Sequence, residues 1–308
     1  MSYIIETTNL SKKYGQHQAV SNINFKVKKG GMFAFLGLNG AGKSTTINIL
    51  CSIIKKDEGQ IIIDGKDLDK ESHLIKEKIG IVFQRSVLDE QLTVIQNLES
   101  RASLYQLTKK ESQQRIKYLV EILTLEDILN RPYGKLSGGQ KRKVDIARAL
   151  IHEPKILFLD EPTTGLDPNT RITVWEILHK LIKEKDLTIF LTTHYMEEVV
   201  MANHVVILDE GKIVAEGSPD TLKDQYATDL LRIIASKNPK INQLLEENKI
   251  TYQYDKESYH IPVKNSKEAF NIIQLNPDLL NNFEVLKGNM DQVFLKVTGK
   301  KLEGLHAK

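Results

Sequence analysis

The chain has 308 residues, 41% hydrophobic and 27% charged, with a formal net charge of +3 at pH 7. These values are ordinary for a soluble globular protein long enough for two domains, and the interspersed lysines and glutamates do not argue for nucleic-acid binding. No window approaches the ~20 apolar residues of a membrane helix, and no secretory signal is visible at the start. We therefore expect a cytoplasmic protein that reaches a membrane only through a partner.

Strands and helices alternate through the first two hundred residues. The pattern predicts an antiparallel pair, a buried strand, a helix and two further strands at 3–10, 20–27, 32–36, 44–55, 58–68 and 78–84. Helices are expected at 93–107 and 111–125, within a helical insert at about 88–137. Helix, strand, helix, strand, helix and hairpin then follow at 140–151, 155–160, 172–184, 187–194, 195–204 and 205–217. Such alternation predicts an α/β domain.

The segment GSPDTLKDQY, residues 217–226, reads as a domain boundary and divides the chain into residues 1–225 and 226–308. Beyond it the expected order is strand, helix, strand, strand, helix, strand, at 230–235, 241–248, 250–254, 259–263, 267–276 and 283–286. This order is that of the ferredoxin-like split arrangement. An amphipathic segment follows at 289–299, and we expect the basic tail beyond Gly299 to fray.

A glycine-rich loop between the strand at 32–36 and the following helix predicts phosphate binding. Residues 37–44, GLNGAGKS, fit the pattern G-x-x-x-x-G-K-[ST]. The glycines let the backbone wrap around phosphate oxygens, Lys43 would reach the β- and γ-phosphates, and Ser44 would coordinate Mg²⁺. A chance glycine-rich turn would not explain the flanking strand and helix. The nucleotide-binding residues expected here are Gly37, Asn39, Gly40, Ala41, Gly42, Lys43, Ser44 and Thr45.

Two adjacent carboxylates end the apolar strand at 155–160. Asp160 can reach a Mg²⁺ ion beside the loop, and Glu161 would face the γ-phosphate, where it could polarise an attacking water. Adjacent carboxylates also occur in solvated turns. After an apolar strand, and with a phosphate-binding loop in the same chain, the roles of metal ligand and general base are favoured.

A second anion-binding pattern, LSGGQ, lies at residues 136–140. Gly138 and Gly139 follow Ser137 and precede a basic, helix-forming run. Such a segment presents bare backbone N–H groups at a helix N-terminus to an anion. The chain therefore has two segments predicted to bind phosphate, but only one of them contains a phosphate-binding lysine.

Together these residues resemble the ATP-binding subunit of an ABC transporter over about residues 3–225. Residues 37–44 match the family's Walker A motif, LFLDEP its Walker B motif, and LSGGQ its signature. The resemblance implies an α/β fold: a P-loop NTPase cassette with an antiparallel β subdomain and the helical insert at 88–137. A small C-terminal α+β domain of ferredoxin-like order would follow at 226–308.

The resemblance also assigns roles to residues that carry no signal of their own. GLDP, residues 165–168, is similar to the D-loop and puts Asp167 at the nucleotide; Tyr14 in KKYG matches the aromatic that stacks on adenine. Without the family context, Tyr14 would be a surface aromatic and His194 a structural histidine. The catalytic set implied is Glu161, His194 as the switch histidine and Gln84 of the Q-loop. The Mg²⁺ ligands implied are Ser44, Gln84 and Asp160.

Two copies of the cassette are expected to pair. In the family each ATP lies between the Walker A loop of one subunit and the signature of the other, so the dimer, homo- or heteromeric, completes both sites. The residues expected on the partner's γ-phosphate are Ser137, Gly138, Gly139 and Gln140. The two phosphate-binding segments of one chain would thus contact two different ATP molecules.

Among ABC proteins, three classes compete. Translation factors carry two cassettes in a chain, and DNA-maintenance ATPases carry a long coiled coil before the signature; neither feature is present here. The remaining class is a transport ATPase, peripheral on the inner face of the membrane through a separate permease. LTTHYMEEV and MDQVFLKVTG are similar to bacterial exporters of drugs, antibiotics, peptides or Na⁺, and the substrate itself cannot be read. Residues 84–100, with Val87 and Leu88 exposed, are expected to dock the permease.

Overall fold

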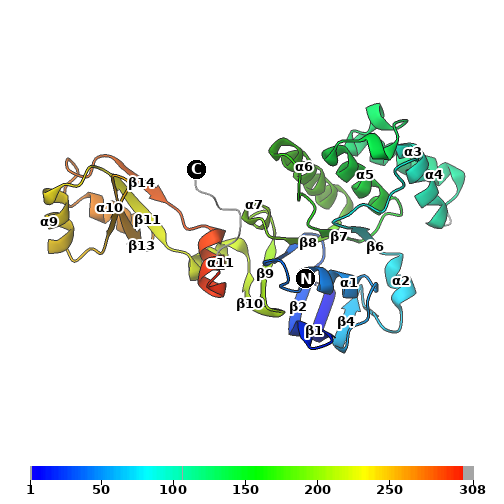
Figure 1. Cartoon of the computed structure of the whole chain (residues 1–308), viewed down its shortest axis with the longest axis horizontal. Coiled ribbons are helices and arrows are strands. Elements are labelled where there is room, and N and C mark those ends of the chain that lie inside the picture. Colours follow the sequence, from blue (N-terminus) through cyan, green and yellow to red (C-terminus); the bar gives the residue numbers. More distant parts are fainter. Residues whose placement is uncertain (1, 106, 301–308) are drawn as a thin grey trace. The chain divides into compact units, whose positions relative to one another are not determined.

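The computed structural model describes residues 2–105 and 107–300, which form two compact units, Met1–Glu216 and Gly217–Lys308 (Figure 1). The first unit ends at Glu216, whereas the sequence placed the domain boundary at 225–226. The segment expected to mark that boundary contains a helix of the second unit, started by Ser218 as N-cap and a proline in the first turn. Position 106, inside an expected helix, and residues 301–308, the expected frayed tail, lie outside the described residues.

A six-stranded sheet runs through the first unit in the order β10-β9-β3-β8-β7-β6. Its strands are β3 (Met32–Leu36), β6 (Ile79–Val82), β7 (Ile156–Asp160), β8 (Thr188–Thr193), β9 (His204–Asp209) and β10 (Lys212–Gly217). The pairs from β9 to β6 are parallel, and every residue of β3, β7 and β8 is buried, as expected of strands covered on both faces. The carboxyl ends of β3, β8 and β7 are therefore neighbours.

A second, antiparallel sheet has the order β2-β1-β4-β5. Its strands are β1 (Tyr3–Tyr14), β2 (His17–Lys28), β4 (Glu58–Ile63) and β5 (Lys66–Asp67), and the neighbouring helices are α1 (Lys43–Leu50) and α2 (Ser72–Lys76). Buried side chains of both sheets and of α1 form one apolar core, which includes Ile5, Phe25, Phe35, Ile47 and Phe190. This core supports the loop that joins β3 to α1.

Helices make up the rest of the first unit: α3 (Val94–Ala102), α4 (Lys109–Leu123), α5 (Gly138–Leu150), α6 (Pro168–Lys185), α7 (Met196–Val199) and the short 3₁₀ turns Ser103–Tyr105, Glu126–Ile128 and Tyr133–Lys135. The first three α-helices each begin with a capping box.

Three helices expected in the first unit are shorter than the sequence predicted. The first ends at Leu50 because Ser52 takes a left-handed conformation, and the second gives way to a 3₁₀ turn after Ala102. The helix expected at 195–204 stops at Val199. Asn203 accepts a hydrogen bond from the N–H of Met32 through Oδ1 and donates its own N–H to the Met32 carbonyl oxygen. These two bonds place the chain beside β3, where β9 begins.

The second unit has the ferredoxin-like arrangement that the sequence predicted. Its elements are α8 (Pro219–Tyr226), β11 (Asp229–Ile234), α9 (Pro239–Glu247), β12 (Gln253–Asp255), β13 (Ser258–Val263), α10 (Ser266–Ile273), β14 (Phe283–Leu286) and α11 (Met290–Thr298). The sheet order is β12-β13-β11-β14, with antiparallel pairs throughout. In neither unit does the described part of the chain contain a helix long and apolar enough to cross a membrane.

Candidate active site

The glycine-rich loop connects β3 to α1 and leaves the start of α1 open to a ligand. The N-cap of α1 is Gly42, which offers no side chain to the first N–H groups of the helix, so these donors are free for an anion. Gly42 has a φ of 102°, and a Cβ there would lie 2.5 Å from the carbonyl oxygen of Ala19. Only glycine lets the loop lie this close to β2 in this conformation.

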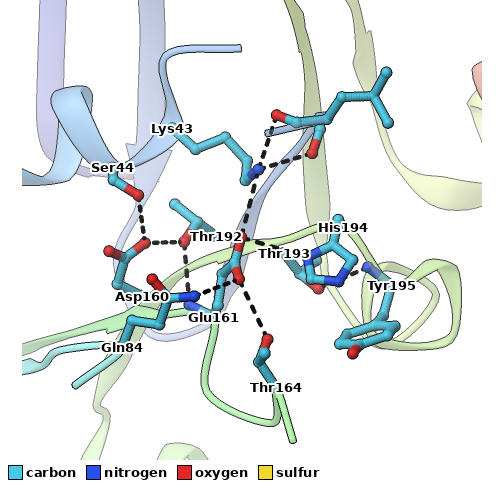
Figure 2. Close-up of polar contacts among 12 residues, drawn as sticks. Lys43, Ser44, Gln84, Asp160, Glu161, Thr164, Thr192, Thr193, His194 and Tyr195 are labelled. Atoms are coloured by element: carbon cyan, nitrogen blue, oxygen red, sulfur yellow. Dashed lines mark hydrogen bonds and ion pairs between the residues drawn. The ribbon is translucent and has the colours of Figure 1, made fainter. Parts of the chain in front are cut away.

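Lys43 lies buried at the centre of the loop, where only 4% of the residue is exposed. Its Nζ donates hydrogen bonds to the carbonyl oxygens of Gly37 at 2.8 Å and Leu38 at 3.1 Å, and lies 3.6 Å from Oε1 of Glu161 (Figure 2). Burial lowers the pKa of the ammonium, while the Glu161 carboxylate opposes that shift. The loop thus holds a positive charge in place in a poorly hydrated site.

Asp160 ends β7 beside the first turn of α1. Its Oδ1 accepts hydrogen bonds from Ser44 Oγ at 3.1 Å and from Thr192 Oγ1 at 2.6 Å. A carboxylate and a hydroxyl side by side are the oxygen ligands that Mg²⁺ prefers, and protein sites for this ion leave its other positions to water and phosphate. The residues present therefore fit a Mg²⁺ ion that arrives with a nucleotide.

Glu161 follows in a left-handed backbone conformation with φ of 47°, held by a hydrogen bond from its N–H to the carbonyl oxygen of Thr192. Its Oε2 accepts from Gln84 Nε2 at 3.2 Å and from Thr164 Oγ1 at 3.3 Å (Figure 2). His194 Nδ1 lies 3.3 Å from Oε1, without the alignment of a hydrogen bond, so this contact is electrostatic when the imidazole is protonated.

The surroundings of Glu161 favour its charged form. The His194 imidazole and then the Lys43 ammonium lower the pKa of the carboxyl below its ordinary value, although burial acts in the opposite direction. At neutral pH the group is therefore a carboxylate, and it can orient a water molecule and accept its proton.

A cavity of about 370 Å³ opens above these residues. The loop residues Asn39, Gly40, Gly42 and Lys43 to Thr45 line it together with Gln84 and Glu161, and the hairpin of β1 and β2 closes one side. From that hairpin Tyr14, 49% exposed, faces the cavity, so its ring is accessible to a base. His17 and Ala19 also line it. Sequence reasoning missed both, although the turn after Tyr14 pairs His17 directly with that residue.

The signature loop starts α5 and contributes no residue to this cavity, as far as the chain is described. Ser137 Oγ accepts a hydrogen bond from the N–H of Gln140, and the Gln140 side chain accepts one from the N–H of Ser137. A Cβ on Gly139 would lie 2.4 Å from Thr170 Cγ2 at the start of α6, so packing alone favours glycine at this position. Asp167 caps α6 by accepting from the Thr170 N–H, and it too lies outside the cavity.

The structure thus brings the predicted residues of the glycine-rich loop close to those of the Walker B segment, the Q-loop and the switch histidine. The residues of the signature and of the D-loop lie outside this cavity. The structure also adds two residues that no local pattern indicated, Thr192 and Arg142. The Thr192 hydroxyl contacts the Asp160 carboxylate and the N–H of Glu161. Arg142 lies in the basic, helix-forming run after the signature, and the sequence analysis assigned it no role. It is in fact buried and donates to the backbone of the Walker B segment.

A buried parallel sheet with a glycine-rich lysine loop, a serine–aspartate metal pair and an ionised carboxylate defines a P-loop nucleoside triphosphatase. The comparisons narrow the class. A family model described as ABC transporter matches residues 20–164. A daunorubicin resistance ATP-binding protein of Streptomyces coeruleorubidus is 31% identical over 99% of this chain and 98% of its own length. The bacitracin transport ATP-binding protein of Bacillus licheniformis is 37% identical over 83% and 82%.

Solved structures resemble the cassette. CbiO1 of Clostridium perfringens, part of an ABC transporter complex, has a TM-score of 0.67 and 33% identity and covers 72% of this chain and 91% of its own. A dimeric ATP-binding cassette in a post-hydrolysis state with ADP and Pi has a TM-score of 0.64 and 30% identity over 70% and 98%. The chain belongs to the ATP-binding proteins of ABC transporters and hydrolyses ATP.

Proposed function

We propose that this chain is the motor subunit of an exporter, which couples Mg²⁺-dependent ATP hydrolysis to transport through a separate membrane permease. The observation that carries the proposal is the buried set of Lys43, Asp160 and Glu161, which offers a cation for the phosphates, a metal ligand and a general base. The relatives named for daunorubicin resistance and bacitracin transport support a drug-like or antibiotic substrate. They favour export over the alternatives of translation or DNA maintenance, which neither name supports.

In this mechanism the chain's own groups divide the work. The free N–H groups of α1 and the Lys43 ammonium bind the phosphates, while Ser44, Asp160 and Gln84 would hold Mg²⁺, which neutralises phosphate charge when bound. Glu161 orients the attacking water and accepts its proton. Gln84 and Thr164 fix Oε2 of this carboxylate, so Oε1 is directed to the Lys43 side.

We further propose that two copies share two ATP molecules. The signature loop of the chain lies outside its own nucleotide cavity, and Ser137 is exposed at the start of a 13-residue helix. A related cassette is dimeric in its ADP- and Pi-bound state. Each signature would therefore serve the ATP held by the partner's Walker A loop.

The permease would dock in a groove of about 480 Å³ beside the Q-loop. Three exposed apolar side chains, Ile53, Val87 and Leu104, stand along it. Its lining also contains four of the buried polar atoms that lack a hydrogen-bond partner among the described residues: Ser52 Oγ, Arg101 Nε, Arg148 Nε and His152 Nδ1. Buried polar atoms are rarely left unsatisfied, so a protein segment with apolar and hydrogen-bonding groups fits this groove.

The groove differs in part from the expected segment 84–100. Val87 is 60% exposed and lines it, but Leu88, expected to be exposed beside it, is half-buried and does not. Ile53 and Leu104 lie outside the segment, because the groove is made by elements far apart in the sequence.

Val87→Glu tests the function together with its docking site. The variant, reconstituted with a membrane permease that stimulates the wild-type ATPase activity, should keep basal ATPase activity but lose permease-stimulated ATPase activity and export. Val214→Glu, the same change on strand β10 outside the groove, is the matched control and should keep both. Stimulation that survives Val87→Glu would contradict the docking site. The absence of any ATP-dependent transport by the wild-type pair would contradict the exporter function.

A further inference from the structure

One buried side chain of the signature helix contacts two separate catalytic segments. Arg142 Nη1 donates to the carbonyl oxygen of Phe83 at 2.6 Å, immediately before Gln84. Its Nη2 donates to the carbonyl oxygens of Glu161 at 2.7 Å and Asp160 at 3.4 Å, and its Nε donates to that of Pro162. All three guanidinium nitrogens are therefore engaged with backbone, and only 7% of the residue is exposed.

Arg142 supplies hydrogen-bond donors to backbone carbonyl groups that have left the β-sheet. The left-handed conformation at Glu161 breaks the regular course of β7, so the carbonyl groups that follow leave the sheet and require other donors. Burying a guanidinium costs free energy, and burial lowers the pKa of Arg142. The planar fork offsets that cost because it reaches several acceptors at once, which a lysine ammonium cannot do in the same geometry.

The same helix also holds the far side of Gln84. Asp145, one turn after Arg142, accepts hydrogen bonds from Ser86 Oγ at 2.6 Å and from Tyr133 Oη at 3.1 Å. The backbone on one side of Gln84 is thus tied to α5 through Phe83, and the other side through Ser86. Ser137, at the start of α5, lies only about 7–8 Å along the helix axis from Arg142, at 1.5 Å rise per residue. A shift of the signature loop would therefore also move Arg142.

We propose that Arg142 is a positioning residue: it fixes the position of Glu161 relative to Gln84, and that position depends on where α5 lies. Contact of the signature with the partner's ATP is thereby transmitted to the carboxylate that activates water in the chain's own site. Within the described residues, the hydrogen bonds of Arg142 go to backbone oxygens, and the proposal gives it no part in proton transfer. The inference rests on the proposed function, since it assumes a signature loop that binds nucleotide on a second subunit.

Arg142→Lys tests this role, because it keeps a positive charge but loses the fork. A misplacement of about 1 Å can cost ~10²-fold in rate, so we expect kcat of the purified full chain to fall 10- to 100-fold. The Kd for a fluorescent ATP analogue should change less than threefold. Tyr133→Phe removes a buried hydrogen bond to the same helix without touching Glu161, and it should lower the melting temperature with little change in kcat.

A double-mutant cycle separates positioning from general damage. If Arg142 acts through Glu161, adding Arg142→Lys to Glu161→Gln should cause no further loss in single-turnover hydrolysis. Should the lysine variant not fold, Ser86→Ala, an exposed change that frees the other side of Gln84, should lower kcat about threefold or more at unchanged ATP affinity.

Three results would overturn the inference: a wild-type kcat in Arg142→Lys, a loss of ATP affinity as large as the loss of rate, or an equal further loss in the Glu161→Gln background. Each can occur in a protein that still hydrolyses ATP and drives export. Failure of the proposed function would show itself differently, as a wild-type chain without ATPase activity.

Discussion

Glu161→Gln should separate nucleotide binding from hydrolysis. The glutamine has the size of the glutamate, and its amide can still bond to Gln84 or Thr164, but it cannot accept a proton. Loss of general-base catalysis costs ~10²–10⁴-fold in rate, or about 3–5 kcal/mol of barrier. Lys43, 3.6 Å from the lost charge, would keep its place on the loop carbonyls. Binding of ATP should therefore survive in a site that cannot turn over.

The trapped nucleotide should then hold two subunits together. ATP also binds the Walker A loop of the monomer, so the dimer gains only from the tighter binding that the partner's signature adds. If that contact tightens binding a hundredfold, each shared site gives ~2.7 kcal/mol and the two sites together give about 5.4 kcal/mol. This corresponds to ~10⁴-fold in the dimerisation constant. Size-exclusion chromatography of Glu161→Gln should show a dimer with ATP and a monomer without nucleotide.

A second substitution decides whether the signature is responsible. Ser137→Arg, added to Glu161→Gln, would fill the signature half of each site and return the protein to monomer while ATP still binds the Walker A loop. Because the change also removes a helix N-cap worth ~1 kcal/mol, Ser218→Arg, which removes the N-cap of α8, is the matched control and should leave the dimer intact. A dimer that persists in the Ser137→Arg double variant would refute the shared-site reasoning.

Two other outcomes follow from the site. Lys43→Ala removes the buried ammonium that faces the phosphates and should abolish most ATP affinity in an equilibrium binding assay; unchanged affinity would contradict the assignment of this loop. For pH, the folded-state pKa of Glu161 lies below its ordinary value of 4.5, so the general base stays ionised as pH falls until that lowered pKa is reached. We therefore expect no loss of kcat attributable to Glu161 between about pH 5.5 and 7.5. A fall in kcat that begins above pH 6 and is absent in Glu161→Gln would contradict the lowered pKa.

Local sequence was sufficient for the parts of the site that a single strand–loop–helix unit determines. The loop around Lys43 and the strand ending in Asp160 need only a buried strand, a turn and the next residues, and the fold confirmed both elements. Their functional roles stay predictions. The ferredoxin-like order of the second unit was equally readable, because each of its elements is short and bounded by turn residues.

What the sequence did not reveal depends on packing between distant elements. Arg142 belongs to a run of basic residues, and only the hydrogen bonds from α5 to the end of β7 show that it is buried. Leu88 was expected to be exposed with Val87 in the docking segment, but it is half-buried. The helix expected after His194 stops early because Asn203 bonds to Met32, more than 150 residues away in the chain. None of these contacts leaves a periodic pattern.

The position of Arg142 has a consequence for the proposed pair of subunits. Its helix begins at the signature, which would serve one ATP, while its guanidinium supports Glu161, which would serve the other. Any influence between the two ATP molecules can then pass through a single polypeptide without crossing the subunit interface. Hydrolysis by the dimer should be cooperative for this reason, with a coupling free energy located in one buried fork of hydrogen bonds.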